Sequence, residues 1–255
     1  MRASCRSRPR QTRNSGQVLI IVALAVSLII ISTVVYVYEL TTATTYSEPM
    51  ALSEYVLMFQ LGSKHVLISS LTNITRGGST EILKSNLNEW CSLVSKQYVL
   101  GKSTLNYALT ETFPYSNGLW IFWSSNGYGV SSVCANFSLA ISGRSVTIKR
   151  NYFLNISTLL QIQGEFSRLN GDDKQVAVVI HLSNENTPAL AKSIHLSYLK
   201  LGEWIETDYT LTDYGNGTYR AFFSASIPSD IVEVSLQVVD QRGILVVANA
   251  TCTET

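Results

Sequence analysis

Histidine, cysteine and proline are scarce in this chain of 255 residues, which contains three, four and five of them. The histidines are scattered, and no two cysteines have the two-residue spacing that is typical of zinc and redox sites. The sequence also lacks the G-x-S-x-G, Walker, H-E-x-x-H, dinucleotide-binding and kinase motifs. We therefore predict no metal, no cofactor and no enzymatic activity.

Charge is absent from residues 18–38. A helix over this run is roughly 31 Å long, which matches the hydrocarbon core of a bilayer. Five arginines and no acid precede the run, and the first acid, Glu39, follows it. By the positive-inside rule, this asymmetry predicts a single-pass transmembrane helix, with a basic cytoplasmic head at 1–17 and with residues 39–255 outside the cell membrane.

A cleaved secretory signal is the main alternative to a membrane anchor. The apolar region of such a signal usually spans about 7–15 residues and ends in small residues at the cut, and Thr41–Ala43 is a weak match. Acids outnumber bases after the apolar run, and the bases form no patch. We therefore expect a membrane partner and no nucleic acid.

Gly16 and Gln17, directly before the apolar run, resemble the class III signal of archaeal type IV pilin-like proteins. In that family a dedicated peptidase cuts after the Gly, and the Gln then begins a helix that anchors the protein or polymerises. Basic residues before the cut also match, whereas Ser15 replaces the favoured Lys or Arg and Ile21 replaces the Glu of bacterial pilins. The resemblance implies processing at Gly16 and association of like subunits through this helix. An uncleaved anchor is the alternative.

Residues 39–101 are predicted to form a helical juxtamembrane stalk. Apolar residues share one face between 50 and 71, with Gly62 as an expected interruption. A second helix is expected over 79–98, capped by Ser79. Its apolar stripe consists of Leu83, Leu87, Trp90, Cys91, Val94 and Tyr98.

Short strand-like runs separated by turn residues fill the remainder, which predicts an α+β fold. We expect one β-rich domain over 102–170 and another over 171–255. In the last strand, alternation places Ala250 and Cys252 on one face and Asn249 on the other. The expected strands cover 104–110, 118–124, 130–142, 145–150, 157–167, 174–183, 192–200, 204–212, 218–226, 231–239 and 244–252.

The segment from Asp213 to Tyr219 (DYGNGTY) resembles the D-x-G-x-Y corner of immunoglobulin-like sandwiches, although it is two residues longer. In that family the Tyr hydroxyl bonds back to the corner backbone, a role that falls here to Tyr219. The resemblance implies that residues 171–255 form an immunoglobulin-like β-sandwich, and it carries no chemistry.

The run Leu119–Trp123 (LWIFW) is the most aromatic in the chain. If they are exposed, Trp120 and Trp123 are candidates to stack on a ligand. Burial in a sheet core is the favoured interpretation, and alternation would then bury either Trp120 with Phe122 or the other three residues.

Three cysteines follow the span, in a compartment where disulfides persist, so one pair among Cys91, Cys134 and Cys252 is expected to form a disulfide, or all three are buried thiols. Five N-x-S/T sequons also follow the span, which fits a glycosylated surface domain. Their acceptors are Asn73, Asn136, Asn155, Asn216 and Asn249.

Taken together, the sequence predicts a non-enzymatic, membrane-anchored cell-surface protein that is a pilin-like or adhesive envelope component. Its expected partners are the membrane, like subunits, and surface glycans or other envelope proteins. One alternative is an ectodomain that binds an envelope polymer or a small solute, which predicts a groove near Trp120–Trp123 and no cut at Gly16. Another is a membrane-tethered hydrolase, whose paired carboxylates have no fixed spacing in sequence.

Overall fold

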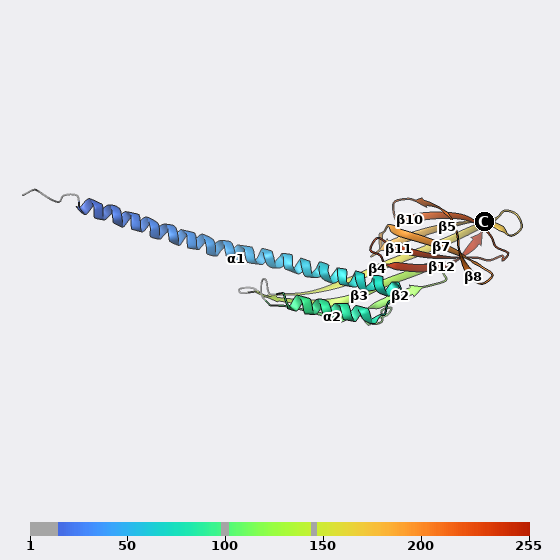
Figure 1. The fold of residues 1–255 in the computed structure, drawn as a ribbon, viewed down its shortest axis with the longest axis horizontal. Helices are drawn as coiled ribbons and strands as arrows, with labels where there is room; N and C mark the ends of the chain where they lie inside the picture. Colours follow the sequence, from blue (N-terminus) through green and yellow to red (C-terminus); the bar gives the residue numbers. More distant parts are fainter. Residues whose placement is uncertain (1–14, 98–101, 144–146) are drawn as a thin grey trace, which may run out of the picture. The chain divides into compact units, whose positions relative to one another are not determined.

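A computed structural model describes residues 15–97, 102–143 and 147–255 (Figure 1). The chain divides into two compact units, Met1–Ser53 and Glu54–Thr255. The described part of the first unit is helical, and the second unit holds the end of this helix, a second helix and the strands. The predicted arginine-rich head lies outside the described residues.

Helix α1 spans Ser15–Thr75 and contains the predicted apolar run. Its segment Ile20–Leu40 is long and apolar enough to cross a membrane, and all its side chains are exposed. Ser27 and Thr33 donate their hydroxyls to carbonyls three or four residues earlier, so these polar groups are satisfied within the helix. The expected stalk residues 39–49 also belong to the helix.

The expected interruption at Gly62 is wrong, because α1 continues through this residue. Helix α2 (Glu81–Ser95) lies against it: a Cβ atom at Gly62 would come within 2.4 Å of two ring carbons of Trp90. Asn86 of α2 also donates to Ser70 Oγ of α1 at 3.0 Å. Gly62 therefore permits the close approach of the two helices.

The predicted apolar stripe of α2 is confirmed by the burial of Leu83, Leu87 and Val94. The N-cap is Thr80 rather than the expected Ser79, and the Thr80 side chain makes no capping bond. Ser79 Oγ instead accepts a bond from the Glu81 N–H at 3.3 Å. The expected end of this helix, including Tyr98, lies outside the described residues.

The end of α1 and α2 cover one face of an antiparallel sheet (Figure 1). Strand β4 pairs with β3 along the whole of β3, and the other edge of β3 carries β2 and then β1. On the helix side, Ser63 Oγ of α1 bonds both Trp90 Nε1 and the Tyr152 hydroxyl, at 3.0 and 2.9 Å. The strands are β1 (Lys102–Leu109), β2 (Leu119–Trp123), β3 (Tyr128–Ser142) and β4 (Thr147–Arg168).

Strand β4 is one long element, so the separate strands expected at 145–150 and 157–167 are wrong. Residues 147–161 pair with β3, and residues 158–168 pair with β5. The strand thus belongs to the helix-covered sheet at one end and to the C-terminal strands at the other. Both expected β domains lie within the second compact unit.

The C-terminal strands form two groups, β4–β5–β10–β9 and β12–β11–β7–β8, that are joined where β12 pairs with the end of β4. Alternating apolar residues of both groups share one core. The expected strand 204–212 is two strands, because β8 pairs with β7 whereas β9 pairs with β10. The bounds are β5 (Asp173–Asn184), β6 (Thr187–Pro188), β7 (Ala191–Lys200), β8 (Glu203–Glu206), β9 (Thr210–Asp213), β10 (Thr218–Ser226), β11 (Val232–Asp240) and β12 (Leu245–Glu254).

The alternation of side chains in β12 and a hydrogen bond of Tyr219 were both predicted from the sequence. The alternation in β12 is confirmed, because Ala250 and Cys252 are buried while Asn249 faces the other side and is half-buried. Tyr219 is buried, but its hydroxyl accepts a bond from the Ala191 N–H at 2.8 Å rather than bonding to its own corner. The fold is therefore α+β with a strand-rich second unit.

Candidate functional site

The sheet face of β1, β3 and β4 that is turned away from the helices holds an open groove of about 530 Å³. Among the described residues, the lining of this groove includes no charged residue and no helix residue. Phe153 projects from the face and is 57% exposed. Neutral amides around an exposed ring suit a neutral ligand such as a sugar. The groove-facing rows are Ala108, Asn136 and Phe153, followed by Asn106, Ser138 and Asn151.

Two predicted glycosylation acceptors belong to this same outer face. Asn136 pairs in register with Phe153, and Asn155 lies two residues beyond it on β4. Both side chains are exposed. The Asn155 Oδ1 accepts bonds from the Tyr115 hydroxyl and Ser132 Oγ, each at 3.1 Å, so its amide is held in a fixed orientation.

The remaining sequons differ in accessibility. Asn73 and Asn216 are exposed, whereas Asn249 is half-buried and its Oδ1 atom is enclosed without a hydrogen-bond partner. Asn249 is therefore the least accessible acceptor of the five. Glycosylation at each position stays a prediction.

Trp120 and Trp123 lie on opposite faces of β2, so the structure does not bring them together as one ligand site. Trp120 packs edge-on against Tyr115, with ring centroids 6.0 Å apart. Trp123 donates its indole N–H to Ser131 Oγ at 3.2 Å. The favoured interpretation of this run as sheet core is also wrong, because Ile121, Phe122 and Trp123 are 38, 48 and 42% exposed.

The disulfide expected among the three cysteines of the second unit is not formed, and all three are free thiols. Cys91 lies on α2, Cys134 is buried on β3 beside Thr110, and Cys252 is buried on β12. A Cβ atom at Gly164 would lie 2.3 Å from Cys252 Sγ, so this glycine makes room for the thiol. Burial raises the pKa of Cys252 to about 12, which keeps it protonated and unreactive.

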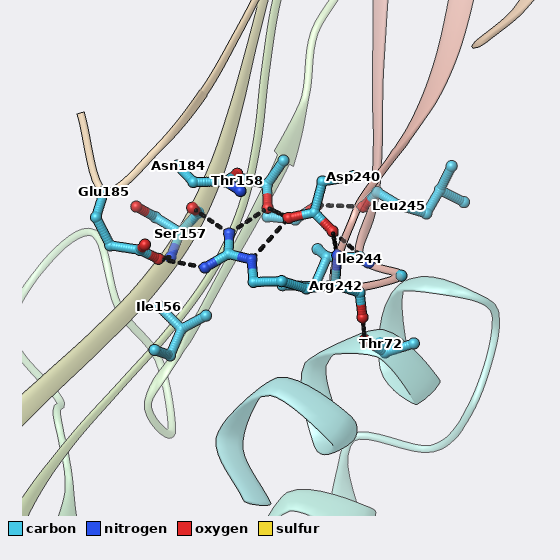
Figure 2. A network of polar contacts seen from close by, with 12 residues as sticks. Thr72, Ile156, Ser157, Thr158, Asn184, Glu185, Asp240, Arg242, Ile244 and Leu245 are labelled. Atoms are coloured by element: carbon cyan, nitrogen blue, oxygen red, sulfur yellow. Dashed lines mark hydrogen bonds and ion pairs between the residues drawn. The ribbon is translucent and has the colours of Figure 1, made fainter. Parts of the chain in front are cut away.

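A network of hydrogen bonds and ion pairs surrounds the β11–β12 turn (Figure 2). Asp240 is fully buried and accepts bonds from Arg242 Nε, Thr158 Oγ1 and the Ile244 N–H at 2.8 to 3.0 Å. The guanidinium of Arg242 also donates to Glu185 at 2.6 Å and to the Ser157 carbonyl on β4 at 2.9 Å. The network thereby ties this turn to β4 and to the turn that follows β5.

The same turn also contacts the end of α1. Thr72 Oγ1 donates to the Arg242 carbonyl at 3.4 Å, and Arg76 donates to the Gly243 carbonyl at 3.1 Å (Figure 2 shows the first bond). The Leu245 N–H donates to Thr75 Oγ1 at 3.3 Å. These bonds connect the end of α1 with the β11–β12 turn and the beginning of β12, so we assign the network a structural role.

The burial of Asp240 could have been found from the sequence, because Asp240 continues a series of buried residues at every second position of β11. The earlier members of this series are Val232, Val234, Leu236 and Val238. An acid in phase with a buried row requires partners. Phe153 gave no comparable signal, since an apolar residue in a strand is usually buried.

The described part of the second unit also holds grooves whose linings contain few acids. Three further grooves measure about 520, 410 and 340 Å³, and the two smaller ones each contain a single acid, Glu165 or Asp208. No cluster of three or more His, Cys, Asp or Glu residues that could hold a metal occurs among the described residues. Gly16 and Gln17, the expected cleavage position, lie at the beginning of α1.

Comparisons with protein-family models, with curated proteins and with solved structures find no match to this chain.

Proposed function

We propose that this protein is a membrane-anchored cell-surface protein without enzymatic activity, a pilin-like or adhesive envelope component. The observation that supports it most is the exposed apolar segment Ile20–Leu40 of α1. An apolar surface of this length is unfavourable in water and requires a bilayer or like helices around it. The arginines before it favour an N-terminus in the cytoplasm and residues 39–255 outside.

The second unit supports presentation to partners rather than catalysis. Its outer sheet face is open and neutral, and it carries Asn136 and Asn155 as exposed sequon acceptors around Phe153. None of the four grooves described above brings two carboxylates together. We propose that the C-terminal strands form an immunoglobulin-like sandwich that is continuous with this face through β4. Adhesion to surface glycans or envelope proteins would use this face.

The pilin-like part of the proposal is tested at Gly16. The full chain is expressed in a host that carries a class III signal peptidase, and the N-terminus of the product is determined by mass spectrometry. We expect a mature protein that starts at Gln17, and complete loss of processing in Gly16→Val. An intact Met1 or Arg2 terminus despite active peptidase would remove the pilin-like route and leave a static anchor.

The second candidate function is recognition of a neutral envelope polymer or solute. The observation that favours it is the groove around Phe153, which lies on the outer face of β4 rather than at the expected Trp120–Trp123. This function requires no processing at Gly16, so the unprocessed outcome of the same experiment would favour it.

A further inference from the structure

Strand β2 presents unpaired backbone groups along its outer edge. The Cys134 N–H donates to the Gly118 carbonyl, and the Ser124 N–H donates to the Tyr128 carbonyl. These bonds fix the antiparallel phase, in which Trp120 and Phe122 turn their backbone polar groups toward β3. The backbone N–H and C=O groups of Leu119, Ile121 and Trp123 therefore point away from the sheet.

In the described part of the chain, Leu119 alone of these three residues has a backbone hydrogen-bond partner on the outer side. Ser116 exchanges two backbone bonds with Leu119, at 2.9 and 3.0 Å. No backbone bond to the outer groups of Ile121 or Trp123 occurs among the described residues. The outward backbone groups of Ile121 and Trp123, which are separated by one residue, are thus available to pair with a further strand.

This edge has few of the features that protect natural edge strands from pairing. Soluble proteins place charges, proline or bulges on exposed edges. No Asp, Glu, Lys, Arg or His occurs between residues 112 and 143, and β2 has regular register with β3. The last three side chains of β2, those of Ile121, Phe122 and Trp123, are nonetheless at least 38% exposed, and these residue types have high β propensity. The edge is suited to an uncharged extended strand.

We infer that β2 pairs with β2 of a second copy of this chain, antiparallel about a two-fold axis at Phe122. In that register Ile121 faces Trp123 of the other copy, and Trp123 faces Ile121, so the available groups of both strands bond to one another. Phe122 faces its own symmetry mate at a non-hydrogen-bonded position, where the side chains are closest. A second copy fits because its edge is equally neutral and offers the same two residues at the same spacing.

This association goes beyond the proposed function and does not depend on it, because it requires only that two copies meet. Association of like subunits through α1 would involve different residues. A test must therefore report on the geometry at β2 and not on oligomeric state alone.

The test uses symmetric disulfide trapping of the full chain in detergent or membranes. Across the proposed axis the two Cα atoms at position 122 lie about 4.5 Å apart, within the range of a disulfide. The Cα atoms at position 123 are offset along the strands and lie roughly 9 Å apart, beyond that range. The variants are Phe122→Cys and, as the matched control on the same strand, Trp123→Cys. Cys5→Ser and Cys91→Ser remove background thiols from both, while Cys134 and Cys252 are buried.

We expect mild oxidation to convert most of the Phe122→Cys chain into a disulfide-linked dimer on a non-reducing gel, with at least fivefold less dimer for Trp123→Cys. Adding Ile121→Pro to Phe122→Cys should abolish the excess, because proline removes an outward N–H without breaking the bonds between β2 and β3. Equal trapping at the two positions, or no trapping at position 122, would overturn the inference. Full trapping in the presence of Ile121→Pro would overturn it as well.

Discussion

Replacing Asp240 with alanine is expected to lower the free energy of unfolding of the second unit by about 3–5 kcal/mol. The carboxylate is fully buried and accepts bonds from Arg242, Thr158 and the Ile244 N–H. Its removal leaves buried donors without a partner and leaves Arg242 with only part of its counter-charge. The loss is measured by denaturant unfolding with tryptophan fluorescence. All four tryptophans lie in the second unit, so the signal reports on that unit alone.

The control for this change is a second arginine–acid pair that lies on the surface. Arg168 donates to Glu254 at 2.7 and 3.2 Å, and these bonds lower the pKa of Glu254, but both side chains are well exposed. Solvent screens such pairs, so Glu254→Ala should leave the unfolding midpoint unchanged within error. A loss as small for Asp240→Ala as for Glu254→Ala would contradict the structural role of the network.

A single methyl group at Gly129 should be almost as damaging. The turn between β2 and β3 docks between two strands of the C-terminal groups: the Gly127 N–H donates to the Asn249 carbonyl at 2.7 Å, and the Ile162 N–H donates to the Gly127 carbonyl at 2.8 Å. A Cβ atom at Gly129 would lie 2.2 Å from the Val247 carbonyl oxygen. Because backbone rather than a mobile side chain must move, we expect Gly129→Ala to cost about 3 kcal/mol.

The control for the contact between Gly129 and the Val247 carbonyl is the variant Gly171→Ala. Gly171 has φ of +57° and nothing within 4 Å of an added Cβ atom, so its substitution carries only the cost of a left-handed backbone, roughly 1 kcal/mol. Unfolding midpoints of both variants are measured under the same conditions as above. Equal losses for the two glycines would show that β3 does not press against β12 in the way described.

The sequence predicted those features that depend on near neighbours along the chain. The stripe of Leu83, Leu87 and Val94 repeats at helical spacing, and α2 buries these residues. The alternation in β12 likewise predicted that Cys252 faces inward. Such patterns survive folding because one face of each element packs on the core.

Features that depend on distant partners could not be predicted. Gly62 usually weakens a helix, but here Trp90 of α2 packs on it and α1 continues. The expected strands left a gap between residues 150 and 157, yet β3 supplies a pairing partner for every residue there, and β4 continues. In both cases a contact from another element overrides the local preference.

In the candidate site too, the sequence predicted local features but not contacts between distant segments. The sequons and the run Leu119–Trp123 were visible as motifs, but their neighbours were not. Phe153 between Asn136 and Asn155 becomes a surface feature only through the register of β3 with β4. The exposed edge of β2 depends on β1 and β2 sharing one side of β3, a property of topology rather than of composition.

We propose that residues 20–40 anchor the chain in a membrane and that the second unit lies on the outer side. Leu201 offers a test position, because it lies in the turn between β7 and β8 and is 86% exposed. Leu201→Cys, with Cys5→Ser and Cys91→Ser, is treated in intact cells with a membrane-impermeant maleimide, and the membranes are then washed with alkaline carbonate. We predict full labelling before lysis and retention of the chain in the membrane pellet. Labelling only after lysis would contradict the outer location of the second unit, and release of the chain by carbonate would contradict the membrane anchor.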